Sequence, residues 1–167
     1  MPDRKLVRQL ASASIGIAFL VMGLKFIAWY VTGSVALYSD ALESIVNVIA
    51  AGIAWYAIRI AHKPADDDHP FGHHKAEYFS AVAEGVLIVL AALFIIEAAW
   101  RAFHAPVAMD APALGLAINA LATTINAVWA YMLVSTGRKA RSPALVADGM
   151  HIYTDVITSI GVLAALL

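Results

Sequence analysis

The sequence predicts an all-α fold, a polytopic bundle of transmembrane helices with five spans. One reason is composition: 62% of the 167 residues are hydrophobic and 14% are charged, whereas soluble domains average roughly 45–50% and 25%. The second reason is that the apolar residues stand in continuous runs long enough to cross a bilayer, which takes about 20 residues. Transmembrane β-barrels instead show alternating segments of about 10 residues, and the sequence does not follow that pattern.

The five apolar runs follow one another with short polar segments between them, at residues 10–31, 35–60, 76–100, 113–136 and 144–167. Gly33 separates the first two runs, and Pro64, Pro106 and Pro143 stand in the three later connections, where they keep a helix from continuing. Basic residues precede the first run, as in a signal peptide, but the run exceeds the ~7–15 residues of a signal-peptide core. We therefore interpret it as a span.

Lysine and arginine gather at alternate connections. Those near the start and in the second and fourth connections are Arg4, Lys5, Arg8, Arg59, Lys63, Lys75, Arg138, Lys139 and Arg141. The first and third connections contribute only Arg101. Because cytoplasmic loops are enriched in basic residues, we expect a multi-pass protein of the cell (inner) membrane, with its N-terminus and residues 61–75 in the cytoplasm.

Two of the predicted spans carry polar side chains that a bilayer disfavours. They are Asp40, Glu43 and Asn47 in the second run and Asp148, His151 and Asp155 in the fifth. Offsets of three and then four place each set on one stripe of a helix. If the two helices are neighbours, the stripes form a polar pocket whose carboxylate and imidazole groups suit a divalent metal or protons. The alternative is that they are only hydrogen bonds between helices.

Other polar residues within the runs are interpreted as structural pairing or as a water-lined surface; they are Lys25, Glu84, Glu97, Asn119 and Asn126. The connection after the second run holds a further candidate site. Asp66, His69 and His73 have plausible spacing for metal ligands, and Pro70 and Gly72 favour a compact turn that brings them together. The alternative is a solvated acidic loop.

Composition also excludes several function classes. A net charge of −1 disfavours a nucleic-acid partner. Cysteine is absent, so a metal site must use histidine, carboxylates and neutral oxygen atoms. The sequence has neither the His-Glu-x-x-His pattern of metalloproteases nor a glycine-rich phosphate loop, so we expect no enzyme and no ATP-driven pump.

The loop sequence PADDDHPFGHHKAE at 64–77, GSVAL at 33–37, and the pair His151 and Asp155 resemble the cation diffusion facilitator family. Its members are metal/proton antiporters that export divalent cations from the cytoplasm. The resemblance covers essentially the whole chain. It therefore favours transport over simple helix packing.

The resemblance implies specific site residues. The transport site between the second and fifth helices would use Glu43, Asn47, His151 and Asp155. The loop site would use Asp66, His69 and His73, with His74 as a spare ligand. Asp40 and Asp148 are candidates for a second shell, although Asp40 could instead bond Lys25 or cap its helix.

The family commonly has two Asp, or His and Asp, where this chain has Glu43 and Asn47. Asn47 supplies an oxygen that does not titrate, and an oxygen-weighted site tolerates iron, manganese or cobalt as well as zinc. No organic cofactor is expected. The family also has a sixth helix, commonly a cytoplasmic C-terminal domain, and a homodimeric state, so we expect residues 1–167 to be a shortened transmembrane cation-efflux domain. The alternative functions are a metal-binding membrane scaffold and a fragment that does not transport.

Overall fold

The computed structural model describes residues 4–104 and 113–166, and in this part the chain forms helices without strands. The five helices are α1 (Arg4–Thr32), α2 (Val35–Ala61), α3 (Lys75–His104), α4 (Ala113–Ala140) and α5 (Pro143–Leu166). The predicted all-α class is therefore confirmed. Pro106, which the sequence interpretation uses as a helix breaker, and Leu167, the last residue of the fifth run, lie outside the described residues.

The first helix starts before the predicted span. Prediction from continuous apolarity begins at residue 10, because Arg4, Lys5 and Arg8 interrupt the run. In the structure α1 already begins at Arg4, and Val7 is buried in the main hydrophobic cluster together with Leu133 of α4 and Leu145 of α5. Packing of this amphipathic first turn, which the bilayer argument does not consider, extends the helix.

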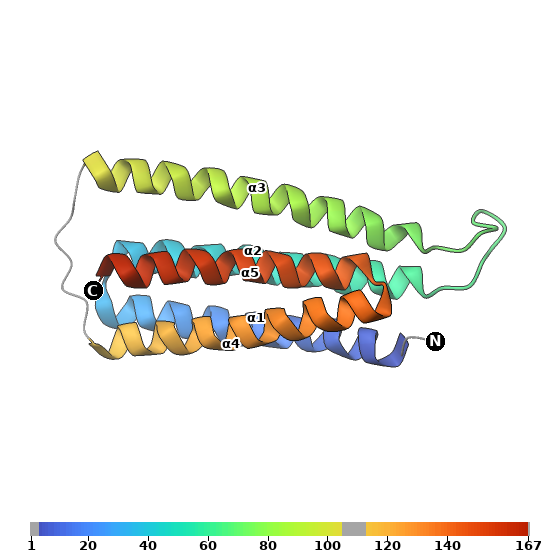
Figure 1. The fold of residues 1–167 in the computed structure, drawn as a ribbon, viewed down its shortest axis with the longest axis horizontal. Helices are drawn as coiled ribbons and strands as arrows, with labels where there is room; N and C mark the ends of the chain where they lie inside the picture. Colours follow the sequence, from blue (N-terminus) through green and yellow to red (C-terminus); the bar gives the residue numbers. More distant parts are fainter. Residues whose placement is uncertain (1–3, 105–112, 167) are drawn as a thin grey trace.

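Two helices occupy the middle of the bundle. Figure 1 shows α2 and α5 between α3 on one side and the pair α1 and α4 on the other. The closest helix pairs are α4 with α5 and α1 with α2, and α2 also packs against α5. The helices that carry the two polar stripes are therefore direct neighbours.

Four helices of the described chain, α1 to α4, are long and apolar enough to cross a membrane. Within the described residues, α5 is not among these candidate spans. It carries Asp148, His151 and Asp155, which lower its hydropathy, and it packs against α2, α3 and α4. A central place among other helices is where a membrane protein can hold a polar stripe.

The bundle buries several polar and charged side chains and exposes many large apolar ones. Its fully buried side chains include Lys25, Asp148 and Asp155, whereas Phe94 and Ile157 are 68% and 67% exposed. A water-soluble core has the opposite distribution. The exposed apolar surface fits the hydrocarbon tails of lipids, and the chain is a multi-pass membrane protein.

The basic clusters meet at one end of the bundle. Figure 1 shows the start of α1, the connection between α2 and α3 and the turn between α4 and α5 at the same end, with the α1–α2 turn at the other. Gly33, at φ +64°, closes the α1–α2 turn, and Ser34 caps α2 by accepting a bond from the Leu37 N–H. This arrangement fits the predicted clustering of positive charge.

Close helix contact depends on glycines in α4 and α5. A Cβ added at Gly149 would lie 2.7 Å from Val134 Cγ2 and 3.0 Å from the Val134 backbone nitrogen. A Cβ at Gly115 would lie 2.1 Å from Thr32 Cγ2 of α1. Small residues therefore let α5 and α1 approach α4, which fixes the depth of the polar side chains on α5.

Candidate functional site

Carboxylates from both stripes meet inside the bundle. Oxygen atoms of Asp40 and Glu43 on α2 and of Asp155 on α5 all lie within 4.8 Å of one another. Asp40 and Asp155 are buried, and Glu43 is partly exposed. The hydroxyl of Thr158 also donates to Glu43 across 3.3 Å. The stripes on α2 and α5 thus face each other, as their spacing suggests.

An ammonium group lies between these carboxylates. Lys25 Nζ of α1 lies 3.0 Å from Asp40 Oδ1, 2.8 Å from each oxygen of Asp155 and 2.8 Å from Ser159 Oγ. Ser159 donates to Asp40 at 2.7 Å, and Asn126 Nδ2 of α4 donates to Asp155 Oδ2 at 2.6 Å. Four helices therefore contribute to one network around Asp155. Of the three roles suggested for Asp40, the bond to Lys25 is present in the structure, and Asp40 also belongs to the acidic group.

His151 and Asn47 lie beside this network. They are 3% and 4% exposed, and in the described part of the chain their side-chain nitrogen and oxygen atoms have no hydrogen-bond partner. The carboxylate group that meets within 4.8 Å does not include His151. Because α2 and α5 run in opposite directions (Figure 1), Asn47 and His151 both lie one turn from it, toward the end that carries the α2–α3 connection.

Of the four side chains expected at the transport site, the structure brings Glu43 and Asp155 directly together. Asn47 and His151 form the next level of the same two stripes. Buried polar atoms without a partner are few in native proteins. A site with this donor set could bind a cation if both levels contributed ligands.

The surroundings of Asp148 differ from those expected of a second-shell residue at the transport site. It is fully buried, one turn before His151, and its Oδ2 accepts a 2.7 Å hydrogen bond from Ser14 of α1. Ser14 in turn accepts from Trp129 Nε1 of α4 at 3.2 Å. Asp148 thus ties α5 to α1 and α4.

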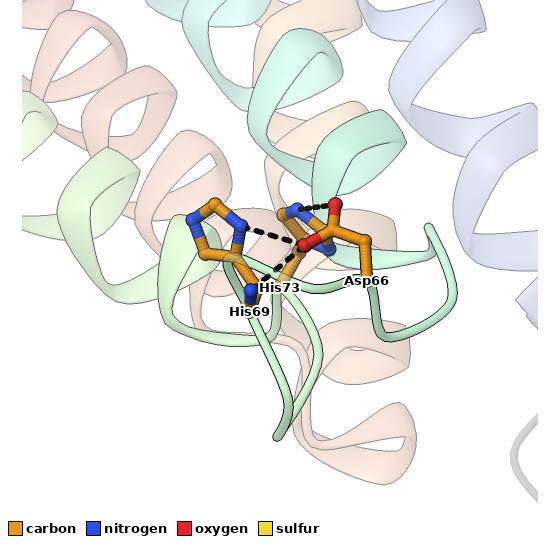
Figure 2. A group of neighbouring side chains, drawn as sticks. All are labelled: Asp66, His69 and His73. Atoms are coloured by element: carbon orange, nitrogen blue, oxygen red, sulfur yellow. Dashed lines mark hydrogen bonds and ion pairs between the residues drawn. The ribbon is translucent and has the colours of Figure 1, made fainter.

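The loop candidates form a compact cluster, shown in Figure 2. Asp66 lies between two imidazoles: its Oδ1 is 3.0 Å from His69 Nδ1, and its Oδ2 is 3.3 Å from His73 Nε2. The centroids of the two rings are 4.3 Å apart. All three residues have a ligand atom within 4.8 Å of the others, and His74 is not part of this group.

Turn chemistry explains how the loop reaches this shape. Gly72 adopts φ +78°, which favours glycine, and its N–H donates to His69 O at 2.9 Å. The His69 N–H donates to Asp66 Oδ1 at 2.8 Å. Desolvation acts to raise the pKa of Asp66, but hydrogen bonds from the His69 side chain and backbone and the nearby charge of His73 lower it overall. The carboxylate therefore stays ionised and available as a ligand.

Sequence reasoning anticipates the bond between Lys25 and Asp40, but it misses the bonds of Lys25 and Asn126 to Asp155 and the place of Ser159 beside the acidic group. Lys25 and Asn126 were interpreted as structural pairing, and Ser159 gave no signal. A charge count would have helped, since Lys25 is the one cationic side chain in the first apolar run. Buried acids need positive partners.

Comparisons with known proteins place the chain in a family. Residues 11–167 match the family described as the cation efflux transmembrane domain. The chain is 48% identical over 96% of its length to an uncharacterized transporter of Synechocystis, and it covers 52% of that protein. It is 35% identical to the cation-efflux pump FieF of Cronobacter sakazakii and 33% identical to that of Serratia proteamaculans, over 97% of this chain and 54% of each relative.

The chain thus spans about half the length of the curated relatives it matches. The match covers all five helices and includes both polar stripes and the histidine-containing loop. It agrees with the resemblance seen in the loop sequence. The chain belongs to the cation efflux family, and it carries the transmembrane domain of a cation diffusion facilitator.

Proposed function

We propose that this chain carries a divalent metal cation of the zinc, iron, manganese or cobalt class out of the cytoplasm in exchange for protons. Glu43, Asn47, His151 and Asp155 are the ligands of the transported ion. Relatives named as cation-efflux pumps support export of a cation. The choice among metals and the exchange for protons rest on the chemistry of the side chains.

The observation that carries this proposal is the meeting of acidic oxygens inside an apolar bundle. Asp40, Glu43 and Asp155 approach within 4.8 Å, although like charges repel one another strongly away from water. Such a group persists only with positive charge or protons beside it, and the single charge of Lys25 does not balance three carboxylates. The remaining negative charge calls for a further cation or for protons, which are the two species that an antiporter carries. A helix-packing role does not require acids to converge.

Two levels of donors on α2 and α5 suggest how the site is completed. Glu43 and Asp155 form one level, and Asn47 and His151, whose polar atoms lack partners, form the next. Asn47 and His151 each lie one turn from a carboxylate on the same helix, so rotation of their side chains toward that level brings an amide oxygen and an imidazole nitrogen toward the two carboxylates. Alternating access by relative motion of helices around a fixed central site is common in transporters.

Proton exchange follows from ligand chemistry. A metal ion binds ionised carboxylates and neutral imidazole, so loading releases protons and protonation expels the metal. Two carboxylates, one amide and one neutral imidazole balance the charge of a divalent ion. An inward proton gradient then drives the metal outward.

The loop cluster of Asp66, His69 and His73 is part of this proposal as a second metal site on the cytoplasmic side. It lies at the end of the bundle where the basic clusters gather (Figure 1). Its role is either to guide metal toward the transport site or to stabilise the loop. By family analogy alone the working unit is a homodimer.

The experiment is transport in proteoliposomes with a metal-sensitive dye and a pH-sensitive dye inside. Metal added outside should produce coupled metal and proton fluxes with wild-type protein, and Asp155→Asn or His151→Ala should abolish both. Thr154→Val serves as the matched control, because Thr154 lies on the same helix and its hydroxyl donates to the backbone oxygen of Met150 one turn earlier. Unchanged fluxes after substitution of all four ligands would contradict transport through this site and favour the scaffold alternative.

A further inference from the structure

Lys25 holds an unusual position for a basic residue in a transmembrane helix. It is the largest fully buried side chain in the described part of the chain, with 0% exposure. Near a helix end a lysine can extend to the headgroups. Lys25 instead points into the bundle, and Nζ contacts Asp40, Asp155 and Ser159 at 2.8–3.0 Å.

This ammonium lies where a cation bound to the acidic group would lie. Asp40, Glu43 and Asp155 form that group, and Nζ contacts the carboxylates of two of its three members. Both oxygens of Asp155 are 2.8 Å from Nζ, and Oδ2 also accepts a bond from Asn126. In this arrangement Asp155 has little capacity left for a metal ion.

A metal that binds Asp155 must therefore displace Lys25 from at least one oxygen, because two cations repel each other at such a distance. Lys25 has a second place available. Asp40 Oδ1 and Ser159 Oγ, which are already bonded to each other at 2.7 Å, can hold the ammonium without Asp155.

We propose that Lys25 is a tethered competitor for the transport site, which neutralises Asp155 when no metal is bound and retreats to Asp40 and Ser159 when metal loads. This inference rests on the proposed function, and it adds the residue that sets how tightly the site binds metal. Lys25 weakens binding of every cation and returns to Asp155 as metal leaves. It thereby favours release over permanent retention.

Metal affinity, measured by isothermal titration with Zn²⁺ and Co²⁺ at one fixed pH, tests the inference. All variants carry His69→Ala and His73→Ala, so that only the transport site titrates. Lys25→Met/Asp40→Asn removes one positive and one negative charge and leaves Asp155 free. We expect this charge-balanced variant to bind at least about tenfold tighter than the parent protein, which would be a change of ~1.4 kcal/mol.

For the single variants we expect weaker metal binding instead of tighter binding. Asp40→Asn and Ser159→Ala each weaken the place to which Lys25 retreats, so metal should bind more weakly, by a factor of about three or more. If Lys25 had only a structural role, Asp40→Asn and Lys25→Met/Asp40→Asn would not change metal affinity in opposite directions. If the double variant folds and binds metal no more tightly than the parent protein, the inference is overturned. If the double variant does not fold, unchanged or tighter metal binding by either single variant overturns it.

The same titrations separate this inference from the proposed function. If Asp155→Asn and His151→Ala leave metal affinity unchanged, the proposed site itself is wrong. If both abolish binding while Lys25→Met/Asp40→Asn binds no tighter than the parent, only the role of Lys25 is wrong. Helical circular dichroism and gel filtration in detergent establish which variants are folded.

Discussion

The hydroxyl of Ser14 on α1 donates a 2.7 Å hydrogen bond to Asp148 on α5, 134 residues later in the chain. Asp148 is fully buried, and its other oxygen has no partner in the described structure. Trp129 of α4 donates to the same hydroxyl. Ser14 thus joins three helices one turn away from His151, which makes Asp148 a structural support for the stripe that carries the proposed ligands.

Ser14→Ala should destabilise the bundle. The change leaves the buried carboxyl of Asp148 without its donor, and an unmet buried polar group costs roughly 1–3 kcal/mol. Unfolding in mixed detergent micelles measures the loss. Ser12→Ala is the matched control on the same helix, because Ser12 is exposed and bonds Trp55 at the surface; we expect a change within about 0.5 kcal/mol. Equal losses in the two variants would contradict this role.

Gly149→Ala should loosen the contact between α4 and α5. The new methyl group would lie 3.0 Å from the backbone nitrogen of Val134, which cannot rotate away, and overpacking typically costs about 1–3 kcal/mol. Gly161→Ala on the same helix is the control, since an added Cβ there meets nothing within 4 Å. In that variant alanine's better helix propensity should be neutral or stabilising by up to ~1 kcal/mol. Relative to wild type, Gly149→Ala should lower the free energy of unfolding, whereas Gly161→Ala should leave it unchanged or raise it.

The helices could be predicted from the sequence because each one is a long apolar run, and a bilayer demands such runs. The start of a helix is hardest to predict where packing against other helices, rather than contact with lipid, decides it. Val7 belongs to α1 because it packs against Leu133 and Leu145, although the charged residues around it look like a segment outside the membrane. The pairing of α2 with α5 could be anticipated because their polar stripes have the same spacing.

The arrangement within the site could be predicted only in part. Spacing along one helix predicts that Glu43 and Asn47 share a face, but the bond between Lys25 and Asp155 joins residues 130 positions apart. Such a contact leaves no local pattern, since it depends on how far α1 enters the bundle. The loop cluster was easier, because Asp66, His69 and His73 are close in sequence and a glycine turn brings them together.

Asp66→Asn should weaken metal binding at the loop by at least about tenfold. The carboxylate lies between both imidazoles (Figure 2), and an amide has no charge to offer the ion. Cobalt titration followed by visible absorption, in a chain carrying Asp155→Asn to silence the transport site, reports the affinity. Asp67→Asn is the control, because Asp67 is a neighbouring exposed acid outside the cluster. Equal effects of the two substitutions would mean that only general charge attracts the metal.

The metal-free loop should keep its shape in mild acid. The pKa of Asp66 is lowered below its ordinary value of 3.8, so its contribution to stability is present above that value and is lost only as the pH falls through the lowered pKa. The NMR shift of the His69 amide proton, which bonds Asp66 Oδ1 at 2.8 Å, follows this carboxylate. It should move mainly below pH 3.8 and be insensitive there in Asp66→Asn. A transition centred clearly above that pH that disappears in Asp66→Asn, and therefore belongs to the carboxylate rather than to an imidazole, would show that the carboxylate is not held by His69.

Asn47 should influence which metal the transport site prefers. Its amide offers a neutral oxygen, whereas imidazole suits zinc and carboxylate suits manganese better. Asn47→His should therefore raise the ratio of zinc to manganese affinity, and Asn47→Asp should tighten both ions while changing that ratio in favour of manganese. Isothermal titration with zinc, iron(II), manganese and cobalt measures all four affinities. Asn119→Asp serves as the control: this buried amide of α4 lies outside the two stripes and should not alter the order of metals. If the order stays the same in both Asn47 variants, Asn47 is not a ligand of the transported ion.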